Sequence, residues 1–146
     1  MTKVLLSLHV LAALVAIGPV AVAASMFPAV ARRAFADGGE DVGNLRMLYR
    51  ICRVYALVGI AIPVFGFATA GIMHVTGNAW VLVSIGLTAL AAAILAVLIL
   101  PRQQRVLTTR DVAASARLAL YTGLFNLLWA AVTVLMIVRP GSTTSA

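Results

Sequence analysis

The sequence of 146 residues carries little charge: only 10% of the residues are Asp, Glu, Lys or Arg, and 63% are hydrophobic. An average soluble domain is roughly 25% charged and 45–50% apolar. A soluble domain of this length could not hide so much apolar surface, because it buries only about 70% of what the unfolded chain exposes. The composition excludes an ordinary soluble enzyme and a disordered tail, and it points to a membrane protein.

Cysteine is almost absent, since Cys52 is the only one in the chain. One cysteine cannot form an internal disulfide, a CxxC redox motif or a cysteine-rich zinc site. The sequence therefore excludes a secreted disulfide scaffold and a thiol redox enzyme of the bilayer.

Charged side chains are also missing from three long segments, residues 4–31, 54–101 and 118–138. Pumps and proton-coupled exporters need an ionisable residue within the membrane. A small four-span multidrug exporter, for example, would carry a glutamate in its first span. The uncharged segments exclude most ion-coupled mechanisms.

The same three segments predict the fold. A helix needs about 20 apolar residues to cross ~30 Å of hydrocarbon, so the middle segment can hold two spans, separated by a turn signal at residues 74–78. Open strands would leave backbone groups unpaired in lipid, so each span must be helical. We expect an all-α transmembrane four-helix bundle, a single domain over residues 1–139 followed by a disordered tail at 140–146. The predicted spans lie near residues 5–27, 54–74, 80–100 and 118–138.

The basic residues predict an orientation. Of the eleven Lys and Arg residues, Lys3 and Arg139 lie on one side of the predicted spans and the other nine lie on the opposite side. The positive-inside rule places the nine in the cytoplasm and both termini outside, in the bacterial cytoplasmic (inner) membrane. We expect seven of them to meet anionic lipid head groups, and we expect no nucleic-acid partner. These seven are Arg32, Arg33, Arg46, Arg50, Arg53, Arg102 and Arg105.

An alternative is that residues 1–24 form a signal peptide, with Lys3 before an apolar stretch and a cleavage site at residues 21–23. Cleavage would leave three spans. It would also place the arginine-rich connection between the first two predicted spans outside, against the positive-inside rule. The apolar segment also continues to residue 31, beyond a usual signal core. Four spans are therefore the favoured interpretation.

A weak internal repeat suggests two parallel helical hairpins. In each half a proline is followed four residues later by an arginine, and the next helix opens with Arg and Tyr. The matching residues are Pro28, Arg32, Arg46 and Tyr49 in the first half, and Pro101, Arg105, Arg117 and Tyr121 in the second. Parallel repeats of this kind occur in membrane proteins, but chance similarity between helix ends is the alternative.

Small residues should let the helices pack closely. Gly59, Pro63, Gly66 and Ala70 share one face of the second predicted span. Such faces allow membrane helices to associate without a hydrophobic driving force. Pro63 should also bend this span near its middle.

The two histidines are the sharpest chemical lead. His9 and His74 both lie near the outer ends of neighbouring predicted spans. Imidazole ligates haem iron and copper, so this pair predicts a haem b or copper site. Met26 and Met73 are further soft donors. The alternative is that both histidines are structural residues at the membrane interface.

The fourth predicted span carries a mildly polar stripe formed by Thr122, Asn126, Trp129 and Thr133. An Asn in the middle of the bilayer must find a partner, and hydrogen bonds between membrane helices serve as packing contacts. A contact to a substrate or quinone is the alternative reading of Asn126, Thr122 and Trp129.

The segments Leu8-His9-Val10-Leu11-Ala12-Ala13, Gly18-Pro19 and Arg53-Val54-Tyr55 resemble a family of small four-helix integral membrane proteins of unknown function, frequent in actinobacteria. The Leu-His opening is also similar to copper-resistance D-type proteins and to HemJ-type protoporphyrinogen oxidases. These resemblances imply a four-helix membrane fold and a haem or copper role for His9. The HemJ-type pattern includes a membrane lysine, which no predicted span contains.

Three functions follow from these observations. The first is a non-enzymatic membrane protein, acting as a structural or accessory subunit in a homo-oligomer or a larger membrane complex. The second is a haem- or copper-binding redox protein that uses His9 and His74. The third is a carrier or channel for an uncharged solute, since an ion pore would show charged or polar lining.

Overall fold

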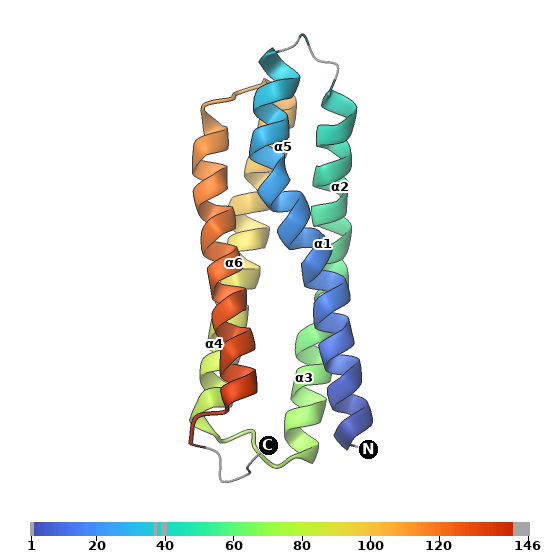
Figure 1. The fold of residues 1–146 in the computed structure, drawn as a ribbon, viewed down its shortest axis with the longest axis vertical. Coiled ribbons are helices and arrows are strands. Elements are labelled where there is room, and N and C mark those ends of the chain that lie inside the picture. Colours follow the sequence, from blue (N-terminus) through green and yellow to red (C-terminus); the bar gives the residue numbers. More distant parts are fainter. Residues whose placement is uncertain (1, 37, 39–40, 142–146) are drawn as a thin grey trace.

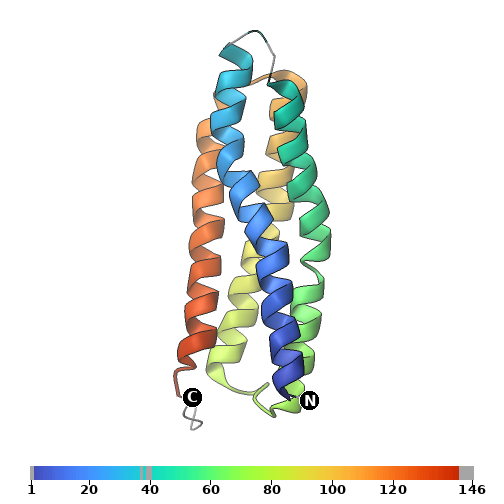
Figure 2. The same ribbon diagram turned by 45° about the vertical axis from the view of Figure 1, so that its right-hand side comes forward.

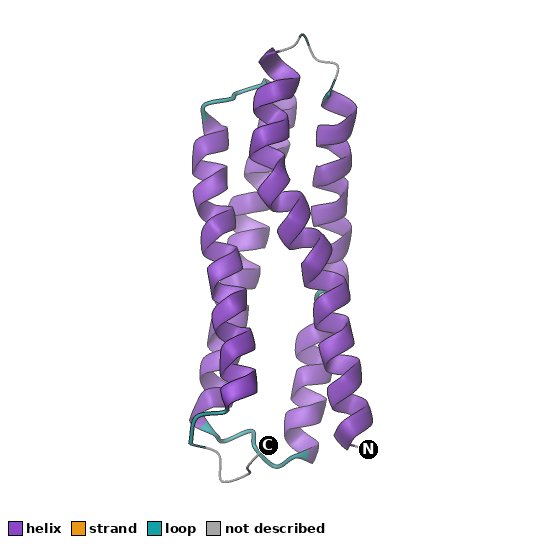
Figure 3. Cartoon of the chain, viewed as in Figure 1, coloured by secondary structure: helices purple, strands orange, loops and turns teal. Residues whose placement is uncertain are grey.

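The computed structural model describes residues 2–36, 38 and 41–141, and its described residues form helices joined by short turns (Figures 1 and 3). The predicted tail at 140–146 lies outside the described residues except for Pro140 and Gly141. The helices are α1 (Thr2–Ala36), α2 (Val42–Val58), α3 (Ala61–Ile72), α4 (Ala79–Ala93), a π-helical segment η1 (Ile94–Ile99), α5 (Leu100–Thr109) and α6 (Ala114–Val138).

These helices form four rods, each long and apolar enough to cross a membrane. The rods are Thr2–Ala36, Val42–Ile72, Ala79–Thr109 and Ala114–Val138. Large apolar side chains lie exposed along all four, among them Leu14, Leu57, Val97 and Leu127. A water-soluble bundle would place such residues inside, so the exposed surface is suited to lipid. The all-helical, four-rod prediction is confirmed, although every rod is longer than its predicted span.

The bundle has two distinct ends (Figures 1 and 2). At one, which we call the turn end, α1 begins, α3 and α4 are joined by residues 73–78, and α6 ends. At the other, which we call the arginine end, α1 ends, α2 begins, α5 ends and α6 begins. Both described chain ends therefore lie at the turn end.

The second rod is interrupted in its middle. Gly59 and Ile60 form a turn between α2 and α3, and the Gly59 carbonyl accepts its hydrogen bond from the Ile62 N–H at 3.1 Å. Pro63 has no N–H with which to reach the carbonyl four residues earlier. That earlier residue is Gly59, which has poor helix propensity. The corresponding residues in α1, four positions before Pro19 and Pro28, are Val15 and Ala24 rather than glycine. The helix α1 stays continuous at both prolines.

The third rod accommodates its proline differently. The segment Ile94–Ile99 is π-helical and directly precedes Pro101. A widened π turn makes room for the proline ring against the preceding backbone. No such segment precedes Pro28 in α1, so the two halves of the proposed repeat differ at their best-matched position.

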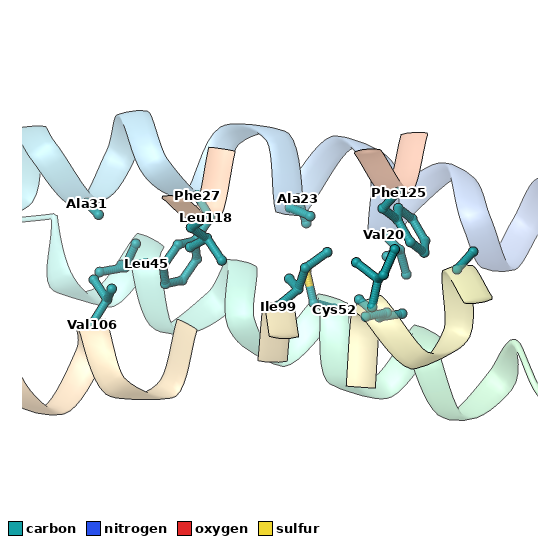
Figure 4. Close-up of a cluster of buried hydrophobic side chains, with 14 residues drawn as sticks. Val20, Ala23, Phe27, Ala31, Leu45, Cys52, Ile99, Val106, Leu118 and Phe125 are labelled. Atoms are coloured by element: carbon teal, nitrogen blue, oxygen red, sulfur yellow. The ribbon is translucent and has the colours of Figure 1, made fainter. Parts of the chain in front are cut away.

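The close-packed core occupies the arginine end and the middle of the bundle (Figure 4). Phe27 from α1, Leu45 from α2, Ile99 from η1 and Leu118 from α6 are each fully buried. Contacts from every rod meet in this cluster, so the core fixes the four helices at the arginine end. The turn end has far fewer buried side chains between the rods.

Candidate functional site: a cavity at the turn end

A cavity of about 640 Å³ lies in the turn-end half of the bundle, lined by α1 and α3 and by α4 and α6. Figure 1 shows these two helix pairs separating toward the turn end. Small side chains on the facing surfaces leave the space unfilled, because they do not reach across between the pairs. They are Ala13, Gly18, Gly66, Ala70, Ala89, Ala92 and Ala130.

Three of the four hydroxyls on the cavity wall are satisfied by the protein itself, whereas the indole N–H groups of Trp80 and Trp129 have no partner among the described residues. The hydroxyls of Thr69, Ser84 and Thr133 each donate to the carbonyl four residues earlier in their own helix, at 2.7, 2.8 and 2.8 Å. A hydroxyl that donates within its helix has no proton left for a ligand. Most of the remaining wall is aliphatic or aromatic, so the cavity presents a surface suited to hydrocarbon.

His9 lines this cavity from α1 and is held in place by α3. Its side chain is 7% exposed, and its Nδ1 lies 3.1 Å from the carbonyl oxygen of Ile62. A ring nitrogen that donates to a carbonyl carries the proton, which leaves Nε2 with its lone pair. A β-carbon on Gly66 would lie 3.0 Å from His9 Cε1, so the glycine makes room for the imidazole.

The structure does not bring His74 to the same place. His74 is exposed in the turn after α3, with φ of 55°, and it is not among the residues that line the cavity. Its neighbour Met73 does line the cavity, whereas Met26 is exposed on α1. Within residues 2–36, 38 and 41–141, no three His, Cys, Asp or Glu side chains gather in a group that could hold a metal ion.

At the turn end of the cavity lies its one charged lining residue, Arg139. Arg139 caps the C-terminus of α6 in the left-handed conformation, with φ of 46°. Its guanidinium carbon lies 5.8 Å from the ring centroid of Trp80, a cation–π contact. The N–H groups of a stacked guanidinium lie in the plane of the group and point outward from its edge. They can therefore donate hydrogen bonds to an anion.

Trp129 forms the deep end of the cavity. Its side chain also lines a second cavity of about 160 Å³, to which all four rods contribute, and the two cavities share Ile17, Pro63, Thr88 and Ala92 as well. The ring packs edge-on against Phe125 at 6.3 Å. Both tryptophans of the chain, Trp80 and Trp129, therefore line the larger cavity.

The rest of the polar stripe on α6 lies outside the cavity. Asn126 donates from Nδ2 to the Ser25 hydroxyl at 3.1 Å, which joins α6 to α1. Thr122 is buried, and its hydroxyl has no partner among the described residues. The stripe therefore divides into two parts: Trp129 and Thr133 face the cavity, while Asn126 connects two helices.

The seven arginines proposed to meet lipid lie at or near the arginine end, far from the cavity. Six of them, Arg32, Arg33, Arg46, Arg50, Arg53 and Arg105, are exposed. Arg102 is half-buried, with its guanidinium carbon 4.5 Å from the ring centroid of Tyr121 and Nη1 donating to the Leu98 carbonyl at 3.2 Å. Their positions are compatible with contact to lipid head groups, which is a proposal.

His9, Met73, Trp129 and Thr133, which were singled out from the sequence, all line the cavity, whereas the sequence predicted neither the cavity nor the position of Arg139 at its end. The chain matches no family model, and comparisons with curated proteins and with solved structures give no significant match. The functional argument therefore depends on the cavity itself.

Proposed function

We propose that this chain is a multi-pass membrane protein that binds the hydrocarbon part of a lipophilic small molecule in the cavity at its turn end. The observation that carries the proposal is the cavity of about 640 Å³ with an almost wholly apolar wall. Ligand sites typically measure about 300–1,000 Å³ and are mainly apolar, with a few polar groups. The cavity has the size and the chemistry of such a site.

The proposed membrane is the bacterial cytoplasmic membrane, with both termini outside. Four apolar rods support insertion, and nine of the eleven basic residues at the arginine end support a cytoplasmic location for that end. The cavity then lies in the outer half of the bilayer. A lipophilic molecule dissolved in that leaflet would be at the right depth to enter it.

The internally bonded hydroxyls of the wall favour hydrocarbon over a polar solute. A sugar or an amino acid would lose its hydrogen bonds to water on entering and find few donors in return, and each unpaired polar group costs about 1–3 kcal/mol. A hydrocarbon chain makes no hydrogen bonds to water, so it loses none when it enters the cavity. This makes binding or carriage of an uncharged lipophilic molecule the proposed activity, with a structural or accessory role in a homo-oligomer or larger complex as the alternative.

A haem b or copper centre is a second proposal, favoured by the position of His9 on the cavity wall. His9 would supply one imidazole, and His74 would have to move from its exposed turn to supply another. An absorption spectrum of the purified protein tests this. A Soret band that disappears in His9→Ala supports haem binding, and a colourless, metal-free protein contradicts both centres.

The chain offers its own reporter for the lipophilic ligand, because both tryptophans line the cavity. The probe is the methyl ester of dibromooctadecanoic acid, an uncharged chain whose bromines quench nearby tryptophan. We expect saturable quenching in the wild type and at least about tenfold weaker binding, or ~1.4 kcal/mol, in Ala89→Phe, which fills the cavity.

The matched control is Ala93→Phe, an exposed alanine one turn along the same helix that does not line the cavity. This variant should bind the ester like the wild type. Quenching that does not saturate, or that is equal in both variants, contradicts the proposed function.

A further inference from the structure

Arg139 stands out because its positive charge lies at the end of an otherwise apolar cavity. The guanidinium is half-buried and is stacked on Trp80, which holds it beside the cavity. Its recorded hydrogen bond runs from Nε to the Met136 carbonyl at 3.4 Å, which is long for an N–H···O bond. The N–H groups of this guanidinium can thus donate hydrogen bonds to a further acceptor.

Among the described residues no acidic side chain supplies that acceptor at the turn end. Asp41 and Asp111 lie on the connections of the arginine end, and the other two acidic residues of the sequence, at positions 37 and 40, lie outside the described residues. Residues 42–110, which include the turn between α3 and α4, contain no Asp or Glu. No acidic side chain of the described residues is therefore placed to pair with Arg139, which leaves its guanidinium able to bind the acidic group of another molecule, such as an amphiphile.

We propose that the ligand is an anionic amphiphile, with its carboxylate or phosphate paired with Arg139 and its hydrocarbon chain in the cavity. This inference rests on the proposed function and names the chemical class of its ligand. Arginine matches both head groups because its planar fork can donate two parallel hydrogen bonds to a carboxylate or a phosphate.

The dimensions of the site agree with this arrangement. Arg139 and Trp129 are ten residues apart on or directly after α6, which corresponds to about 15 Å along a helix. The lining between them includes Thr133 and Met136, and the facing wall includes His9 and Gly66. A chain that enters beside Arg139 would pass these residues and end near Trp129.

The test compares the dibrominated octadecanoate anion with its methyl ester, at an alkaline pH at which the acid is ionised. Wild-type protein should bind the anion about tenfold more tightly than the ester, since hydrogen bonds to charged groups are the stronger ones. In Arg139→Gln the ratio of the two affinities should fall to about one, and saturable binding of the ester shows that the variant is folded.

Arg110→Gln is the matched control. Arg110 also caps a helix C-terminus in the left-handed conformation, with φ of 54°, but it lies at the arginine end and away from the cavity. This variant should keep the tenfold preference. If it loses the preference as Arg139→Gln does, the inference is wrong.

Two other outcomes separate this inference from the proposed function. In the first, the wild type binds the acid and the ester equally, and Ala89→Phe blocks both. That result overturns the inference of an anionic head group and leaves the proposed lipophilic site intact. The absence of saturable quenching by either probe overturns both.

Competition then distinguishes the two sources of the ligand. Displacement of the bound probe by palmitate alone assigns a free fatty acid. Displacement by phosphatidylglycerol but not by phosphatidylcholine assigns an anionic phospholipid. Equal displacement by phosphatidylglycerol and phosphatidylcholine contradicts recognition of the acidic group.

Discussion

The imidazole of His9 on α1 lies directly over Gly66 on α3, so closely that a β-carbon at residue 66 would be 3.0 Å from Cε1 of the ring. The same imidazole lies 3.1 Å from the Ile62 carbonyl, one turn earlier in α3. Together these contacts fix one wall of the cavity. The close approach of the two helices depends on residue 66 having no side chain.

Gly66→Ala should therefore destabilise the protein, because overpacking costs about 1–3 kcal/mol and the helix propensity of alanine offsets only about 1 kcal/mol of that cost. Gly71→Ala is the control, because a β-carbon there meets no atom within 4 Å and alanine favours the helix. Denaturant unfolding in mixed micelles measures both. When His9 is already replaced by alanine, Gly66→Ala should lower the free energy of unfolding much less than it does in the wild type. A similar cost with and without the imidazole would show that His9 and Gly66 are not coupled.

Pro63→Ala should close the break in the second rod. The new N–H at residue 63 can reach the Gly59 carbonyl, which now accepts from Ile62, so α2 and α3 would join into one helix. Hydrogen exchange measures this as slower exchange of the amides at residues 60–62 than in the wild type. Pro19→Ala should leave exchange in α1 nearly unchanged, because α1 is already continuous there. Unchanged exchange at residues 60–62 would mean that the proline does not cause the break.

Gln103 is fully buried in the core, and its Oε1 has no partner among the described residues. Its Nε2 donates only to Cys52 Sγ, at 3.6 Å, and a thiol sulfur is a weak acceptor. Replacing a buried polar group that lacks a partner by an apolar group of similar size is neutral or stabilising. Gln103→Leu should therefore unfold at the same or a higher denaturant concentration, with the exposed Gln104→Leu as control. A loss of more than about 1 kcal/mol would mean that the amide has a partner, such as a buried water.

The proposed orientation predicts which residues an impermeant maleimide can reach in intact cells. In a Cys52→Ala background, Gly77→Cys in the α3–α4 turn should react from outside, and Thr109→Cys at the end of α5 should react only after permeabilisation. Both positions are exposed, so a difference in labelling reports on the side of the membrane. The reverse pattern would place the cavity in the inner leaflet.

Much of the fold follows from local patterns. The uncharged segments identified the four rods, and the arginines identified the end at which they cluster. The rods are longer than the predicted spans, because α1 continues through Arg32 and Arg33 to Ala36, where hydropathy falls but helix propensity does not. The position of the break was less predictable, since it depends on Gly59 and Pro63 together.

The cavity could not be predicted, because it arises from the separation of two helix pairs rather than from any one segment. Gly66 and Ala70 were predicted to let the helices pack closely, yet both also line the cavity. His9 was predicted from the sequence as a haem or copper ligand, which stays a prediction, and only the structure places it against Ile62 and Gly66. Arg139 was interpreted as a topology marker, and its stacking on Trp80 depends on the ends of α4 and α6 lying together.

The central claim is that the cavity at the turn end holds an amphiphile. Its most direct test is mass spectrometry of the protein purified from its own membrane, with wild type, Ala89→Phe and Ala93→Phe compared. The account predicts that one anionic amphiphile per chain is retained by the wild type and by Ala93→Phe and is lost from Ala89→Phe. No bound amphiphile in the wild type, or equal retention by all three proteins, would contradict it.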